Sequence, residues 1–231
     1  MKTKFHIIGF ILFQLLLSCK ERQYQPCICL SKDVQIQAYS EILNELVENH
    51  FNDFYLGKAA DSIFELKTTN LDSEGINKKI IALQNEIYQN PKKFCTIYLD
   101  TFMFPQFNPW CIIEKSSNEL DITIKNLINE FSLNGQDVVD SINTIQSKYN
   151  VEDYTLCTSK VRSMARFDKS DTGCFIGRVA LSKLFFNKTY TEGLLFYRFV
   201  CGGMCGKSEL LVIENSNERW RIKKTILISI R

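Results

Sequence analysis

The chain has 231 residues, a length that suits one sizeable domain or two small ones. Hydrophobic residues make up 45% of it and charged residues 23%, which excludes a chain that is disordered throughout. The 28 basic and 26 acidic residues give a formal charge of +2 with no basic stripe, so nucleic acid is not an expected partner.

The N-terminus has the composition of an export signal. Lys2 and Lys4 make a short basic start, and residues 5–17 form an apolar run that only three residues interrupt. As a helix this run would span about 20 Å, which is short of a hydrocarbon core of about 30 Å. The run therefore predicts the central region of a signal peptide and not a transmembrane helix.

The apolar run ends in Leu16-Leu17-Ser18-Cys19. This segment resembles the lipobox of bacterial lipoproteins, and the resemblance implies cleavage before Cys19 and a diacylglyceryl thioether on its sulfur. An ordinary secretory signal is the alternative, but its Ala-x-Ala-like cleavage site is missing. We expect residues 1–18 to be a removed signal peptide, Cys19 to anchor the chain to a membrane through lipid, and residues 19–30 to include a tether.

Cysteine usage fits an exported protein. Of the nine cysteines, Cys19 is assigned to lipid, and an even number of eight remains. These are Cys27, Cys29, Cys95, Cys111, Cys157, Cys174, Cys201 and Cys205. In an oxidising compartment they predict a disulfide framework, for which on the order of 100 pairings exist, and the sequence alone does not choose among them.

Residues 31–51 are predicted to form a helix capped by Ser31, because apolar residues recur there at three- and four-residue steps. A row of acids lies beside this stripe: Glu41, Glu45 and Glu48. The row is compatible with metal or acid–base chemistry, but such rows are more often a solvated helix face, and that is our prediction. His50 is the only histidine after the signal peptide, and because it ends an apolar stripe we expect a partly buried packing residue and not a catalytic base.

The middle of the chain predicts more helices. Helical patterns cover residues 76–89, 120–131 and 137–149, and residues 94–102 have the pattern of a strand. Residues 104–110 form an aromatic loop with two prolines. If exposed, this loop would stack on a sugar ring or a partner protein; we favour a buried flap over the core, because exposed aromatics at this density are unusual.

The last third changes to a pattern of strands. The expected strands are residues 174–186, 193–201, 209–214 and 220–230, and their short connections predict an antiparallel meander. One face of this sheet is expected to pack on the N-terminal helices. The fold class predicted for residues 31–231 is therefore a single α+β domain, helical over 31–150 and β-rich over 173–231.

The last strand has the clearest alternation. Its apolar residues are expected to share one buried face: Trp220, Ile222, Ile226, Ile228 and Ile230. Arg221 and Lys223 belong to the opposite, exposed face, and Lys224 is the one residue that interrupts the apolar face.

Residues 201–208, Cys-Gly-Gly-Met-Cys-Gly-Lys-Ser, nearly match a phosphate-binding loop. Cys201 stands where that motif needs its first glycine, and the residues that follow predict a strand where the motif needs a helix. The C-x-x-x-C spacing is not that of a thioredoxin motif, and a zinc site lacks two ligands. We therefore expect a glycine-rich hairpin turn with a disulfide between Cys201 and Cys205 across its neck, since opposed strand residues lie within disulfide range.

Several segments of the last third follow one another in a distinctive order. They are residues 181–187 (LSKLFFN), a short apolar strand over 193–197, residues 201–206 (CGGMCG) and residues 220–222 (WRI). This order resembles the C-terminal pattern of a group of uncharacterised bacterial secreted proteins and lipoproteins, with Phe185 at a position where that pattern has glycine. The resemblance implies a shared fold and export, and it implies no chemistry.

Two functions from different classes remain open. The first is a non-enzymatic, lipid-anchored protein of the bacterial cell envelope that binds an envelope protein or a glycan. The second is an envelope hydrolase that uses a carboxylate pair such as Asp168 and Asp171, since acid–base chemistry by two carboxylates needs no histidine. The sequence assigns no catalytic, cofactor-binding or metal-ligating residue.

Overall fold

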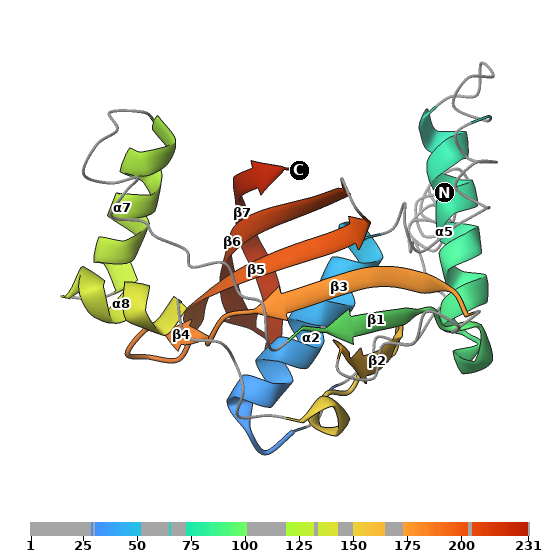
Figure 1. The fold of residues 1–231 in the computed structure, drawn as a ribbon, viewed down its shortest axis with the longest axis horizontal. Helices are drawn as coiled ribbons and strands as arrows, with labels where there is room; N and C mark the ends of the chain where they lie inside the picture. Colours follow the sequence, from blue (N-terminus) through green and yellow to red (C-terminus); the bar gives the residue numbers. More distant parts are fainter. Residues whose placement is uncertain are drawn as a thin grey trace, which may run out of the picture.

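The computed structural model describes residues 29, 31–51, 65, 73–100, 119–131, 134–142, 150–164, 173–202 and 205–230. Within these ranges the chain forms four α-helices and a seven-stranded mixed sheet (Figure 1). The helices are α2 (Val34–Asn49), α5 (Ser73–Tyr88), α7 (Glu119–Phe131) and α8 (Gly135–Ile142). The strands are β1 (Thr96–Leu99), β2 (Lys160–Ser163), β3 (Phe175–Leu181), β4 (Phe185–Phe186), β5 (Glu192–Gly202), β6 (Cys205–Ser216) and β7 (Arg219–Ile230).

The sheet has the strand order β2-β1-β3-β5-β6-β7, with β4 paired to β5. Strands β3, β5, β6 and β7 are antiparallel neighbours, but β1 is parallel to both β2 and β3. The α+β class is confirmed. The antiparallel pairing of the C-terminal strands is also confirmed. Strands β1 and β2 extend this sheet by parallel pairing, which the long segments of chain between β1, β2 and β3 permit.

Helices cover both faces of the sheet, not the single face expected from the sequence. One core cluster combines α2 with residues of β1, β3, β5, β6 and β7. A second cluster lies on the other face, where α7 and α8 pack on Leu194, Phe196, Leu210, Val212 and Ile226. Figure 1 shows α2 crossing the sheet, with α7 and α8 at the end where β4 lies.

The N-cap of helix α2 lies two residues later than the sequence suggested. Asp33, and not Ser31, is its N-cap: its Oδ1 accepts from the backbone N–H groups of Gln35 (2.8 Å) and Ile36 (3.3 Å). On the buried face of α2, the Tyr39 hydroxyl donates to the carbonyl of Ser182 (2.9 Å) and accepts from the N–H of Leu184 (2.8 Å). Tyr39 thereby fixes the helix to the connection between β3 and β4.

Strand β7 changes the face that its apolar residues occupy. Ile222 pairs with Ile213 and Lys224 pairs with Val212, so β7 has one extra residue here, a β-bulge. Trp220 and Ile222 therefore pack in the α2 cluster, whereas Ile226 and Ile228 pack in the α7–α8 cluster. The expectation of one shared face is wrong, and Ile230 is 72% exposed.

Disulfides join distant and neighbouring parts of the chain. Cys95, before β1, is bonded to Cys174, before β3, with Cα atoms 4.6 Å apart and 79 residues of separation. Cys201 and Cys205 are bonded across the β5–β6 hairpin with Cα atoms 5.2 Å apart, and Cys157 is also disulfide-bonded. These bonds fit the expected framework and the expected hairpin pairing.

Cys29 departs from that framework, because it carries a thiol. Its Sγ is buried and donates to the carbonyl oxygen of Thr155 at 3.1 Å, while the Asn44 amide donates to the sulfur at 3.6 Å. Burial raises the pKa of this thiol to about 11, and the negative charge of the nearby Glu41 contributes a smaller increase. The thiol is thus protonated and unreactive at neutral pH.

Among the described residues, no helix combines the length and the apolar character that crossing a bilayer requires.

Candidate functional site

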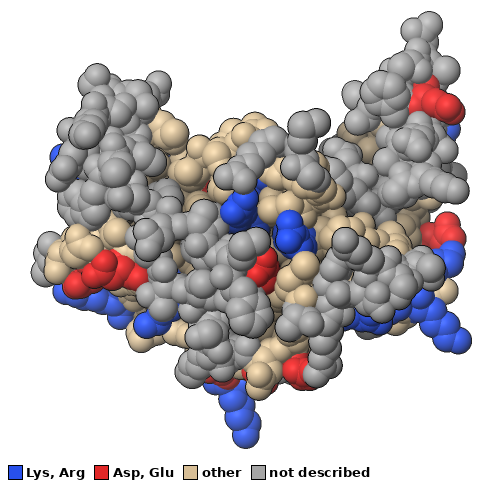
Figure 2. Space-filling view, in the orientation of Figure 1, with Lys and Arg blue, Asp and Glu red and all other residues tan. Residues whose placement is uncertain are grey.

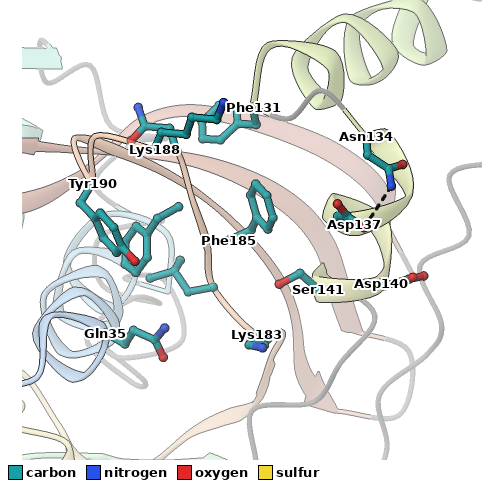
Figure 3. A pocket seen from close by; sticks show the side chains of 13 residues that line it. Gln35, Phe131, Asn134, Asp137, Asp140, Ser141, Lys183, Phe185, Lys188 and Tyr190 are labelled. Atoms are coloured by element: carbon teal, nitrogen blue, oxygen red, sulfur yellow. Dashed lines mark hydrogen bonds between the residues drawn. The ribbon is translucent and has the colours of Figure 1, made fainter.

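A groove of about 700 Å³ opens to solvent between α8 and the β4 segment, and we call it the α8–β4 groove (Figure 3). Its residues come from separate parts of the chain: the start of α2, the end of α7, helix α8, and residues 183–190 around β4. The volume lies within the range of about 300–1,000 Å³ that ligand sites occupy.

Aromatic side chains form the apolar part of the α8–β4 groove: Phe131, Phe185, Phe186 and Tyr190. Tyr190 is 62% exposed, and its ring centroid lies 5.3 Å from that of Phe186. Figure 3 shows Phe185 between Tyr190 on one side and Ser141 of α8 on the other. An exposed ring supported by a second ring provides a preformed surface on which a planar or apolar ligand face can stack.

The turn between β4 and β5 fixes the position of Tyr190. The side-chain oxygen of Asn187 accepts from the backbone N–H groups of Thr191 (3.0 Å) and Glu192 (3.3 Å). The N–H of Tyr190 donates to the Asn187 carbonyl at 3.1 Å. Tyr190 has φ 54°, a left-handed conformation in which glycine or asparagine is preferred and a bulky side chain is unusual.

The charged side chains of the α8–β4 groove balance one another: Asp137, Asp140, Lys183 and Lys188. Asp137 accepts from the Asn134 amide (3.2 Å), and Asp140 accepts from the Gln136 amide (2.6 Å). Figure 3 shows the two carboxylates directed to different sides of α8. They are therefore not arranged as the facing acid and base of a glycosidase.

A second group of polar side chains is buried beside the β5–β6 hairpin. The carboxylate of Glu209, which is 6% exposed, accepts from the Tyr197 hydroxyl and lies 3.0 Å from Lys207 Nζ. His50 Nδ1, at the end of α2, lies 3.9 Å from this carboxylate and 3.5 Å from Lys207 Nζ. We call these four residues the Glu209 cluster.

The protonation of the Glu209 cluster follows from its burial. Burial, followed by the hydrogen bond and the charge of Glu209, raises the pKa of Tyr197, so its phenol stays protonated and donates. Burial, followed by the charge of Lys207, lowers the pKa of His50, so the imidazole is neutral at pH 7. Because each polar group has a partner within the cluster, the Glu209 cluster has the character of a structural ion-pair network.

Two expectations from the sequence concern residues of this cluster. His50 is partly buried, as predicted, but the groups close to its ring are charged: Lys207 and Glu209. Lys207 belongs to the segment that was expected to form a glycine-rich hairpin turn, but its side chain is only 24% exposed and pairs with a buried carboxylate. That correction arises because β6 begins at Cys205, which brings Lys207 into the sheet.

The acids of α2 form neither a solvated row nor a metal site. Glu41, which is 6% exposed, accepts from the backbone N–H of Trp220 at 2.6 Å, and Glu45 accepts from the N–H of Ile222 at 3.0 Å. Burial raises the pKa of Glu41, although the Trp220 hydrogen bond opposes that shift. Nowhere in the described part of the chain do three or more potential metal ligands gather. The predicted solvated face is therefore wrong for Glu41.

Charge on the described surface is mixed. Figure 2 shows acidic and basic side chains interspersed on the visible face. On the sheet, Asp100, Arg178 and Arg198 line a recess of only about 50 Å³. The described residues on this face therefore form no continuous basic surface.

Several residues singled out in the sequence lie outside the described residues: Cys19, Trp110, Asp168 and Asp171. The sequence did not predict the α8–β4 groove, although five of its residues belong to the motif over 181–187: Lys183, Leu184, Phe185, Phe186 and Asn187. That motif gives no indication of which residues of α8 lie opposite it in the fold.

Comparison of the chain with protein family models, with curated proteins and with solved structures finds no match. The function is therefore inferred from the residues of the chain itself.

Proposed function

We propose that this protein is a lipid-anchored, non-enzymatic binding module of the bacterial cell envelope, and that the α8–β4 groove is its binding site. The lipobox-like segment at Cys19 supports the anchor, because two or three acyl chains bind a bilayer durably. The Cys95–Cys174 and Cys201–Cys205 disulfides support export, because such bonds persist in oxidising compartments.

The groove is the observation that carries the binding role. It is open, is lined by aromatic rings and by charges of both signs, and has the volume of a ligand site. By contrast, the titratable residues of the Glu209 cluster are wholly or partly buried, interact with one another, and do not line this groove. The accessible site on the described surface therefore has the features of a binding site and not those of an acid–base catalytic site.

Site-specific photo-crosslinking in living bacteria tests this function. A photoreactive residue at position 141, in the groove, is compared with one at position 175, an exposed position on β3 outside the groove. We expect position 141 to crosslink to an envelope component and position 175 to give no such product. Equal crosslinking at both positions, or none at either, would contradict the proposal.

A parallel assay separates binding from hydrolysis. Purified full-length protein is incubated with isolated envelopes, and soluble fragments are measured over time. We expect envelope association without fragment release. If fragments are released, and Asp168→Asn or Asp171→Asn abolishes the release, the protein is a carboxylate hydrolase and not a binding module.

A further inference from the structure

We propose that the α8–β4 groove binds a neutral saccharide, with one face of a sugar ring stacked on Tyr190. This inference rests on the proposed binding function and names the class of ligand for the same site. It follows from three features of the groove: its charge balance, the conformation of Tyr190, and its openness.

The charges that line the groove favour a neutral, hydroxyl-rich ligand. The residues that line the groove include two acids, Asp137 and Asp140, and two lysines, Lys183 and Lys188. The carboxylates would repel a strongly anionic ligand, and the lysines would repel a strongly cationic one. Hydroxyl groups donate to carboxylates and accept from ammonium groups at the same time, so a saccharide can satisfy both signs.

Tyr190 supplies the stacking surface. Its ring is 62% exposed, rests against Phe186 and lines the groove. Its backbone has φ 54°, where glycine or asparagine would serve the turn better. A bulky residue in an unfavourable backbone conformation points to a role for its side chain. A tyrosine ring combines an apolar face with a polar hydroxyl, which suits the apolar face and hydroxyl rim of a sugar.

The shape of the groove argues against an apolar ligand. A lipid tail requires an enclosed apolar pocket, whereas this groove is open and most of its lining residues are polar. Gln35, Ser141 and Asn187 add amide and hydroxyl groups to the charged ones. An extended peptide is the other class of ligand that an open groove can take, and the experiment below separates it from a saccharide.

Isothermal titration calorimetry on the full-length protein tests the assignment. The protein is kept in a detergent without a sugar headgroup, because such a headgroup would compete for the site. The probes are neutral hexasaccharides of glucose, xylose, galactose and N-acetylglucosamine, with an anionic galacturonate hexamer and a mixed peptide library as comparisons. We expect at least one neutral hexasaccharide to bind with a Kd of about 1 mM or lower, and tighter than the anionic one.

Variants at position 190 distinguish the contribution of the ring to binding from its contribution to the stability of the turn. Tyr190→Gly removes the ring and accepts the positive φ, so it should lower affinity by about tenfold or more while Tm stays within about 3 °C of the parent. Tyr190→Phe keeps the ring and should retain binding within about threefold. Phe175→Ala is the matched control, since Phe175 is an exposed aromatic, 40% accessible, outside the groove.

A variant on the other wall keeps the test decisive if Tyr190→Gly fails to fold. Asp137→Asn removes a charged acceptor on exposed α8 and should weaken binding by about threefold or more. The assignment is overturned if no neutral hexasaccharide binds at about 10 mM, or if both groove variants bind like the parent. Binding of peptides alone would also overturn it, and crosslinking from position 141 would then persist, which distinguishes this failure from failure of the proposed function.

Discussion

The carboxylate of Glu41 on α2 accepts a hydrogen bond from the backbone N–H of Trp220 on β7, and Glu45 repeats this contact with Ile222. Four helical residues rise by about 6 Å and two strand residues by about 6.6 Å, so acids spaced i and i+4 match N–H groups spaced i and i+2. Because β7 is the last strand of the described sheet, α2 satisfies N–H groups that an edge strand otherwise offers to another chain.

Removing the Glu41 carboxylate should therefore destabilise the protein. Glu41→Ala leaves the N–H of Trp220 buried without its acceptor, and we expect the free energy of unfolding to fall by about 1–3 kcal/mol. Urea denaturation measures this change. Glu130→Ala, at an exposed acid of α7, is the matched control and should change stability by less than about 0.5 kcal/mol. Equal effects of the two substitutions would show that the contact with β7 is unimportant.

Trp220 should be one of the most sensitive positions in the core. It is 2% exposed, and its ring lies 5.0 Å from that of Phe186 in the α2 cluster. Trp220→Ala is expected to lower the free energy of unfolding by about 3–5 kcal/mol, because it leaves a large cavity. Arg221→Ala, at the exposed neighbour, should cost less than about 0.5 kcal/mol. A small effect of Trp220→Ala on the urea midpoint would contradict the packing described here.

The Glu209 cluster predicts a pH dependence of stability. His50 has its pKa lowered from 6.5 in the folded protein by burial and by Lys207. In the interval just below pH 6.5 the unfolded chain therefore binds more protons than the folded one, and stability falls as the pH drops. We expect the difference in unfolding free energy between about pH 7.5 and pH 5.5 to shrink in His50→Gln, since few carboxylates titrate in that range. Parallel profiles for parent and variant would contradict this assignment.

The sequence predicted those features of the fold that neighbouring residues determine, and it missed those that distant residues determine. The three- and four-residue periodicity over 31–51 located α2 and its buried face, because neighbouring turns of one helix determine that pattern. The face switch in β7 depends on its register with β6, and Lys224 at the interruption was its only trace in the sequence. The parallel pairing of β1 with β2 and β3 joins segments far apart in the chain, so no local pattern could reveal it.

The candidate site was harder to predict than the fold. Tyr190 lies in the connection between two predicted strands, but its positive φ and the exposure of its ring are properties of the folded turn. The acids Glu41 and Glu45 were noticed, yet their partners are backbone groups about 180 residues away. Side chains that bind distant backbone leave no motif, because backbone N–H groups are the same at every residue.

The proposed lipid anchor leads to a prediction that is independent of the fold. Leu16-Leu17-Ser18-Cys19 places a thiol where the lipid transfer requires its nucleophile. Cys19→Ala should abolish labelling of the chain by radioactive palmitate and cause the uncleaved precursor to accumulate, both visible after gel electrophoresis. Cys201→Ala, which removes a disulfide cysteine far from the signal, should leave labelling intact. Labelling that survives in Cys19→Ala would exclude the anchor.

The two described disulfides should differ in their effect on stability. The Cys201–Cys205 bond closes a separation of 4 residues, whereas Cys95–Cys174 closes one of 79. In the chain-entropy model these loops correspond to about 2 and about 4.5 kcal/mol. Replacing both hairpin cysteines with Ser should therefore lower the free energy of unfolding by about 2 kcal/mol or less and leave the fold intact. The double replacement at Cys95 and Cys174 should lower it by roughly twice as much.

Non-reducing mass spectrometry of the parent verifies both pairings, and urea denaturation of the two variants gives the ratio of the two losses in stability. A hairpin variant that is the less stable of the two would show that the Cys201–Cys205 bond does more than close a short turn, for example by holding Lys207 against the buried Glu209.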